Sequence, residues 1–172
     1  MKFTRIGEKI GYLGKKPKEK AAMISIGEAY SIWTTLVYRY DALMTTKILV
    51  SFVKDEDLKR VVQRGLTILE SQREQLEELA KEFNIPMPAR PPESANVAAD
   101  ISTLTDELIY REIYSGLGDM MFKHVSSFQR AHGSRIRKVF RNFIETEMEL
   151  YDSFYEYGKL KAYLNETPSF RL

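Results

Sequence analysis

Cysteine is absent from this chain of 172 residues, and histidine occurs only at His124 and His132. Without thiols the protein can form no disulfide framework, no zinc–thiolate site and no cysteine nucleophile. The absence also fits a reducing compartment, where disulfides are rare. The sequence therefore excludes the disulfide-rich scaffolds and the thiol-dependent enzymes before any residue pattern is considered.

Long hydrophobic runs are also missing. No stretch approaches the roughly 20 consecutive apolar residues that a membrane-spanning helix needs. Residues 1–9 contain no apolar segment of the kind found in secretory signals. We therefore expect a cytoplasmic protein without a transmembrane segment.

Sequence motifs for the common enzyme chemistries are lacking as well. The chain has no glycine-rich loop that would bind phosphate and no credible nucleophile–base pair. No recognised helix-turn-helix or other DNA-docking motif is present. We expect no catalytic residue and no cofactor, and hence a non-enzymatic protein with a structural or interaction role.

Four long segments show the three- and four-residue spacing of apolar side chains that is typical of amphipathic helices. They cover residues 26–52, 56–83 and 104–131, and a fourth segment with Ser134 as its candidate N-cap. Ser25 and Glu28 form a capping-box sequence before the first segment. The residues predicted to dominate the core are Trp33, Leu36, Tyr40, Leu69, Leu76, Leu117, Met120, Phe143, Leu150 and Phe154.

A proline-rich connector, Asn84 to Thr103, separates the two helix pairs, whereas short turns join the helices within each pair. The pattern predicts an all-α four-helix bundle of ferritin-like topology, with one long crossover between its second and third helices. Each helix should be about 42 Å long, and an extended connector of this length can span that distance. We therefore expect Ser25 and Gly133 to lie at the same end of the bundle.

Charge is distributed unevenly along the chain. Residues 1–20 carry a net charge of +5, whereas the whole chain carries +2. We divide the chain into a basic N-terminal arm, residues 1–22, and a single bundle domain, residues 23–172. Such an arm could bind nucleic acid or an anionic surface. The candidate basic residues for that alternative are Lys15, Lys16, Lys18, Lys20, Arg135, Arg137 and Lys138.

The metal site typical of ferritin-like bundles can be tested against the sequence. A di-iron centre takes a Glu from each of two helices and Glu-x-x-His from each of the other two. Met121 lies three residues before His124, and Gln129 lies three before His132, so the chain contains no Glu-x-x-His. The second helix has Gln72 rather than a carboxylate nearest the centre of its apolar face. The conventional site therefore cannot form.

His124 and Glu147 nevertheless fall at the centres of predicted apolar faces, and buried ionisable groups require partners. They could form a reduced metal site or proton-active pair, with Glu112 as a further weak ligand candidate. Alternatively, they are two separately satisfied polar groups. Counting residues outward from Gly133 places Glu147 level with Leu117 and Gly118 rather than with His124, which favours separate groups. A metal-binding bundle with a reduced site is the alternative function.

Several short motifs, taken in order, resemble one family. They are Gly27-Glu28, Trp33 and Arg39-Tyr40, then Asp55-Glu56-Asp57-Leu58-Lys59, Ile85-Pro86-Met87-Pro88-Ala89-Arg90-Pro91-Pro92 and Tyr157-Gly158-Lys159-Leu160-Lys161. Residues 24–172 are similar to a bacterial domain-of-unknown-function family of ferritin-like four-helix bundles from endospore-formers, some of whose members are labelled spore-coat-like. The resemblance implies the fold, a bacterial origin and an association with sporulation or the spore, but no established activity. Members often carry His near the start of the first helix, where this chain has Ser25.

Overall fold

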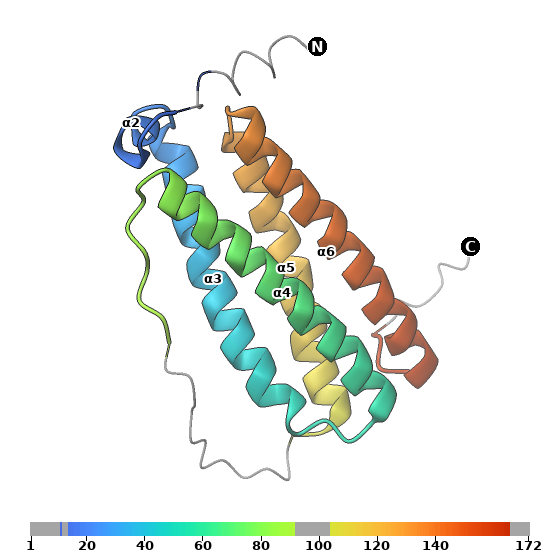
Figure 1. Cartoon of the computed structure of the whole chain (residues 1–172). Coiled ribbons are helices and arrows are strands. Elements are labelled where there is room, and N and C mark those ends of the chain that lie inside the picture. The colour runs from blue at the N-terminus through green and yellow to red at the C-terminus, as the bar shows by residue number, and fades with distance from the viewer. Residues whose placement is uncertain (1–10, 12–13, 92–103, 166–172) are drawn as a thin grey trace, which may run out of the picture.

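The computed structural model describes residue 11 and residues 14–91 and 104–165, and this part of the chain is all-α (Figure 1). Its helices are α2 (Pro17–Ala21), α3 (Ile26–Val50), α4 (Glu56–Glu82), α5 (Asp106–Arg130) and α6 (Ser134–Lys161). The described residues contain no β-strand. Within the same residues, no helix combines the length and the apolar character needed to cross a membrane. The four predicted helices are confirmed, and the ends of the first three lie within two residues of the predicted ones.

Side chains cap the first turns of three long helices. The Ser25 hydroxyl accepts from the Glu28 amide at 3.1 Å, and the Glu28 carboxylate accepts from the Ser25 amide at 2.8 Å. The capping box predicted for α3 is therefore confirmed. At α4 and α5 the side chains of Asp55 and Thr105 accept hydrogen bonds from amides of the first turn, without a reciprocal bond. The N-cap of α6 is Gly133 and not Ser134, which is already the first helical residue.

Hydrogen bonds between chain segments distant in sequence show how the helices run. Glu28, in the first turn of α3, accepts from the amides of His132 and Gly133, each at 2.8 Å. At the other end, Asp106 at the start of α5 accepts from the amides of Lys54 and Asp55, at 2.8 and 2.9 Å. Helix α5 is therefore antiparallel to α3. The prediction that Ser25 and Gly133 lie at one end is confirmed, and that end is uppermost in Figure 1.

The first part of the connector is held against α3 and α4. The Ile85 amide donates to the Ala80 carbonyl at 2.8 Å and turns the chain after α4. Arg90 then donates to Glu77 at 2.9 Å and lies over the Tyr40 ring, and Tyr40 donates to the same carboxylate. Residues 92–103 lie outside the described part of the chain. Because α4 ends where α3 begins, the connector joins opposite ends of the helix pairs.

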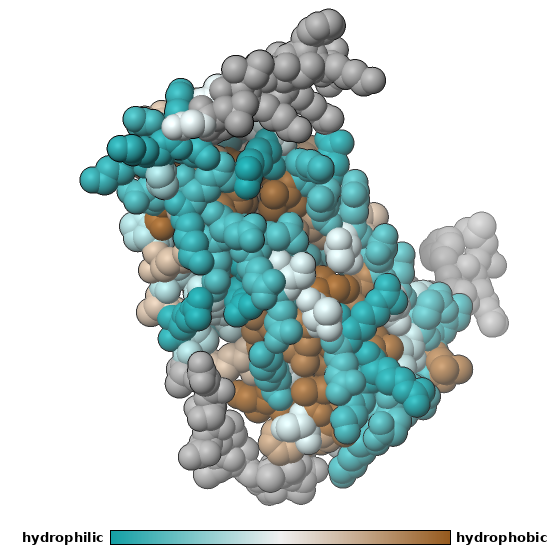
Figure 2. All heavy atoms as spheres, viewed as in Figure 1, coloured by the Kyte–Doolittle hydropathy of each residue, from teal (hydrophilic) through white to brown (hydrophobic). Residues whose placement is uncertain are grey.

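The interior contains two hydrophobic clusters along the bundle axis. The first surrounds Leu36, Leu76 and Phe143, and the second surrounds Leu58, Leu117 and Phe154. Nine of the ten predicted core residues are buried, and the exception is Trp33. On the face shown in Figure 2, hydrophilic side chains cover most of the surface, with hydrophobic atoms visible between them.

Trp33 is 40% exposed, so the prediction that it lies in the core was wrong, whereas the other predicted core residues of this helix are buried. The buried residues of α3 are centred on Ile32, Leu36 and Leu43, and this buried face turns away from Trp33. Trp33 lies on the outer face together with Ile26 and Tyr30, which are 91% and 59% exposed. Helix α3 carries large apolar residues on both sides, so spacing alone could not decide which side faces inward.

Two glycines, Gly116 and Gly118, lie inside α5, and neither marks a tight contact with a neighbouring helix. A Cβ atom added at Gly116 would meet no neighbouring atom within 4 Å, so no close helix approach explains this glycine. At Gly118 the nearest atom is a ring carbon of Tyr151, at an ordinary contact distance of 3.7 Å. The close approach occurs at Gly158 on α6, where an added Cβ would overlap the fully buried Tyr110 side chain.

Candidate functional site

Each long helix contributes a large polar side chain that is almost fully buried in the bundle interior. These residues are Arg39 on α3, Gln72 on α4, His124 on α5 and Glu147 on α6, and none is more than 3% exposed. We call this set the polar layer. Because charged residues are almost never fully buried without a partner, the layer is the strongest candidate for a functional site.

Arg39 connects the charged part of the polar layer. Its Nη2 atom donates to Glu147 Oε2 at 2.9 Å, and the same nitrogen contacts Nε2 of His124. The Nε2 atom of His124 lies 3.6 Å from Glu147 Oε2. Phe143 and Phe140 surround the imidazole, with ring centroids 5.3 and 6.4 Å away. Three helices thus contribute to one ion-paired cluster with hydrophobic walls.

The environment determines the charge state of each group. Burial lowers the pKa of His124, and although the Glu147 carboxylate opposes this, the net pKa lies below its usual value of 6.5. Burial alone would raise the pKa of Glu147, but His124 and Arg39 outweigh it, so the net pKa is lowered. Burial also lowers the pKa of Arg39, and Glu147 offsets part of that effect. Near neutral pH the cluster is an Arg39–Glu147 ion pair beside a neutral imidazole.

The hydrogen-bonding capacity of the polar layer is only partly used. A neutral His124 accepts the Arg39 N–H at Nε2, so its own proton lies on Nδ1. Within the described part of the protein, Nδ1 of His124, Nε and Nη1 of Arg39 and Oε1 of Glu147 have no hydrogen-bond partner. Both polar atoms of Gln72 are also unpartnered there. The layer therefore retains spare donors and acceptors in a region of low polarity.

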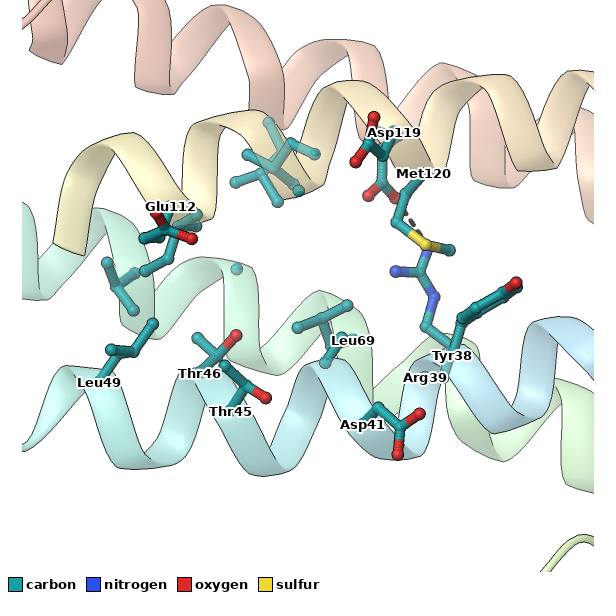
Figure 3. Close-up of a pocket in the computed structure, with 18 of the residues that line it drawn as sticks. Tyr38, Arg39, Asp41, Thr45, Thr46, Leu49, Leu69, Glu112, Asp119 and Met120 are labelled. Atoms are coloured by element: carbon teal, nitrogen blue, oxygen red, sulfur yellow. Dashed lines mark hydrogen bonds and ion pairs between the residues drawn. The ribbon is translucent and has the colours of Figure 1, made fainter. Parts of the chain in front are cut away.

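A cavity of about 420 Å³ opens beside the polar layer, and Arg39 and Glu147 form part of its lining (Figure 3). Figure 3 shows Arg39 reaching from α3 towards Met120 on α5 at one end, with Glu112 at the other end. The lining is mostly apolar and comes from all four long helices. Its apolar members include Leu49, Val62, Leu69, Leu117, Leu150 and Phe154.

The predicted site residues are only partly brought together. His124 and Glu147 are both buried, as their central positions predict, and Glu147 has the partner that a buried carboxylate requires, because it accepts a hydrogen bond from Arg39. The expectation that they lie at separate levels is wrong. Side chains tilt towards the N-terminus of their own helix. In the antiparallel pair α5 and α6, the His124 side chain therefore points away from the connecting turn and the Glu147 side chain towards it, so their tips converge.

Glu112, the third candidate, is separate from the cluster. It is exposed on α5 and lies about 18 Å along the helix axis from His124, at about 1.5 Å per residue. Among the described residues, no three His, Cys, Asp or Glu side chains converge where they could hold a metal ion.

Arg39 is the member of the polar layer whose burial was not predicted from the sequence. It follows Ile32 and Leu36 at helical spacing, so a signal was present once α3 is rotated to its correct face. Glu28, predicted only as part of the capping box, is 2% exposed because it also binds the α5–α6 turn. Glu77 on α4 is also buried, and Tyr40 and Arg90 both donate to its carboxylate.

The basic arm and the α5–α6 turn meet at the end of α4. Lys20 and Arg135 both bind Glu82, at 3.2 and 2.8 Å. Arg137 donates to the carbonyls of Phe128 and Ala131, at 3.2 and 2.8 Å, and these carbonyls lie at the C-terminal end of α5. Lys20 and Arg135 thus pair this basic end of the bundle with the acidic end of α4. Three of the candidate anion-binding residues are thus engaged within the protein.

Comparisons with known proteins agree with this fold. A crystal structure from Bacillus halodurans, of a protein provisionally described as a spore coat protein, matches with a TM-score of 0.80. The match covers 86% of this chain and 96% of that chain at 18% sequence identity, and at this level the likeness shows the fold alone. A search of curated proteins finds no match. The model of the DUF3231 family, proteins of unknown function, matches residues 13–171. This chain, with a proline-rich connector between two helix pairs, belongs to the DUF3231 family.

Proposed function

We propose that this protein is a non-enzymatic structural or interaction protein, built as a four-helix bundle of ferritin-like topology and associated with sporulation. The observation that carries the proposal is the position of the Arg39 guanidinium, between His124 and Glu147 in the bundle core. Ferritin-like carboxylate proteins hold metal ions between Glu and His side chains of facing helices. In this chain a fixed cation takes that place.

The charge of the cluster supports a role without metal. A metal ion that approached Glu147 would meet the guanidinium already bound to Oε2 at 2.9 Å, and like charges repel strongly at short range in a medium of low polarity. We therefore propose that Glu112, His124 and Glu147 are not metal ligands and that Arg39 and Glu147 stabilise one arrangement of the helices. Buried ion pairs have such a specifying role in some proteins.

Contacts between the helices support the proposed topology and domain organisation. Antiparallel α3 and α5, with a connector between opposite ends of the helix pairs, correspond to the single long crossover of ferritin-like folds. We propose that residues 23–172 form one domain, because all four long helices contribute to the polar layer. Residues 1–22 would form a separate basic arm, whose helix α2 is tied to α4 by Lys20 and Glu82.

Metal analysis tests the non-enzymatic part of the proposal. The protein should be purified without a metal-affinity tag and analysed for iron, manganese and zinc. We expect far less than one equivalent of each. One equivalent that disappears in His124→Ala but persists in Glu112→Gln would overturn the proposal and identify a reduced metal site in the core.

The association with sporulation needs a separate test. Its support is the likeness to the Bacillus halodurans structure described above, and we propose synthesis in the cytoplasm followed by retention in the spore. An antibody against this protein should detect it in sporulating cells of the source organism and in purified spores. Detection in growing cells alone would contradict the association while leaving the metal result unaffected.

A further inference from the structure

The structural role proposed above does not explain the cavity beside the polar layer. Its floor is apolar, with Leu69, Leu150 and Phe154 among its members. Its volume of about 420 Å³ falls within the range of about 300–1,000 Å³ that is typical of sites for small organic molecules. Gly116, in its wall, leaves the space above it open, because a Cβ added there would meet nothing within 4 Å.

Charge on the cavity lining favours a positively charged ligand. Asp41, Glu112 and Asp119 are exposed lining residues, and none has an ion-pair partner in the described part of the chain. The remaining charged lining groups are Glu147, Arg39 and Lys123, which leaves the lining with two more negative charges than positive ones. Such a field concentrates cations and disfavours anions.

Buried polar atoms add a second, independent feature. Arg39 is fully buried and lines the cavity, and its Nε and Nη1 atoms have no partner among the described residues. Glu147 contributes one unpartnered carboxylate oxygen beside it. The two side chains neutralise each other's charge, so their spare donors and acceptor suit a neutral polar group such as a hydroxyl.

We propose that this cavity binds an amphipathic cation with an apolar body between α3 and α5 and a neutral polar group at Arg39 and Glu147. Its ammonium group lies at the exposed carboxylates of Asp41, Glu112 and Asp119, which we call the acidic rim. This site goes beyond the structural role proposed above. An anionic lipid or fatty acid does not fit, because the Arg39 charge is already bound by Glu147 and the rim is acidic.

Three probes of equal chain length separate the parts of the proposal. Terminal aminooctanol carries both polar groups, octylammonium lacks the hydroxyl, and hydroxyoctanoate replaces the ammonium by a carboxylate. Titration calorimetry with the full chain at low salt should show aminooctanol binding at least about tenfold more tightly than hydroxyoctanoate, because electrostatic attraction to the rim is largely unscreened. Octylammonium should bind several-fold more weakly than aminooctanol.

A variant that fills the cavity tests whether the probes bind there. Gly116→Leu introduces a side chain into open space, so the protein should fold at least as stably as the original while aminooctanol binding falls more than tenfold. Gly118→Ala is the matched control two positions along α5, outside this cavity, and should bind aminooctanol normally. The combined variant Asp41→Asn, Glu112→Gln and Asp119→Asn should lose the preference for aminooctanol over hydroxyoctanoate.

The proposal would be overturned by a preference for hydroxyoctanoate, by no binding of any probe, or by binding that Gly116→Leu leaves intact. Aminooctanol binding that persists unchanged in the charge-neutralised variant would also refute it, since the acidic rim would then have no role. Thermal unfolding of each variant, measured in parallel, shows that a loss of binding does not reflect a loss of the fold.

Discussion

Replacing Glu147 by Gln would remove the charge that balances Arg39 in the bundle core. Glu147 is 1% exposed, and its carboxylate lies 2.9 Å from the Arg39 Nη2 atom. In Glu147→Gln the guanidinium would keep one neutral neighbour, His124, and would have lost its counter-ion. An uncompensated buried charge is strongly unfavourable because the low-polarity interior cannot replace its hydration.

The expected cost follows from this burial. Breaking a buried ion pair by removing one partner costs about 3–5 kcal/mol. A domain is commonly stable by about 5–15 kcal/mol, so the variant should lose a substantial part of its free energy of unfolding. For a protein of this size each kcal/mol corresponds to about 2–4 °C in Tm. The midpoint of thermal unfolding should therefore fall by about 6–20 °C.

Two further variants show whether the loss arises from the ion pair. Glu145→Gln changes an exposed carboxylate on the same helix and should alter stability by less than about 0.5 kcal/mol. The double variant Arg39→Met and Glu147→Leu removes both charges and keeps apolar volume. It should recover most of the loss, because apolar replacement of a whole buried pair is often neutral or stabilising.

The assay is urea unfolding followed by circular dichroism, with thermal scans as a second probe. Coinciding transitions would support two-state analysis. A loss below about 1 kcal/mol in Glu147→Gln would refute the reasoning, since the carboxylate could not then be the buried counter-ion. A double variant no more stable than Glu147→Gln would show that the cost arises from packing rather than from charge.

Three other changes test the core, the close approach at Gly158 and the imidazole. Leu76→Ala should cost about 2–5 kcal/mol in urea unfolding, because Leu76 is fully buried; a loss below about 1 kcal/mol would contradict the assigned face of α4. Gly158→Ala should destabilise by about 1–3 kcal/mol through overlap with Tyr110, whereas Gly116→Ala should be neutral or stabilising by up to about 1 kcal/mol; equal effects would refute the close approach. The pKa of His124 is lower in the folded state than its usual 6.5, so the unfolded chain binds more protons and stability should fall as pH drops below about 6.5. The slope should be at most about 1.4 kcal/mol per pH unit for one group, and an unchanged slope in His124→Phe would contradict it.

The polar layer illustrates how far the sequence alone could lead. Gln72, His124 and Glu147 stand at the centres of their apolar stripes and could be selected from spacing, because α4, α5 and α6 each have one predominant apolar side. Arg39 could not be selected in the same way, since α3 is apolar on two sides and its inward face depends on its neighbours. The sequence therefore indicated which positions hold buried polar groups on three helices but not the cation that joins them.

The meeting of His124 and Glu147 required the tertiary structure for a different reason. Counting residues from the α5–α6 turn compares the positions of the two backbones along the bundle axis, and by that measure His124 and Glu147 lie at different heights. The length and tilt of the two side chains nevertheless bring His124 Nε2 and Glu147 Oε2 to within 3.6 Å of each other. Similarly, the exposure of Trp33 and the burial of Glu28 depend on which side of α3 meets α5 and the α5–α6 turn.

The amino-acid sequence by itself determined the number of long helices, the ends of the first three, the capping box of α3 and the long connector, because helical spacing, capping and proline content act over a few neighbouring residues. It also excluded the conventional di-iron ligand set, because that set requires residue types at fixed spacing which the chain lacks. Only the tertiary structure decided the rotation of α3, the joining of Arg39, His124 and Glu147, and the cavity beside them. Those features depend on side chains from different helices meeting in space, and helical periodicity carries no information about the relative rotation and offset of two helices.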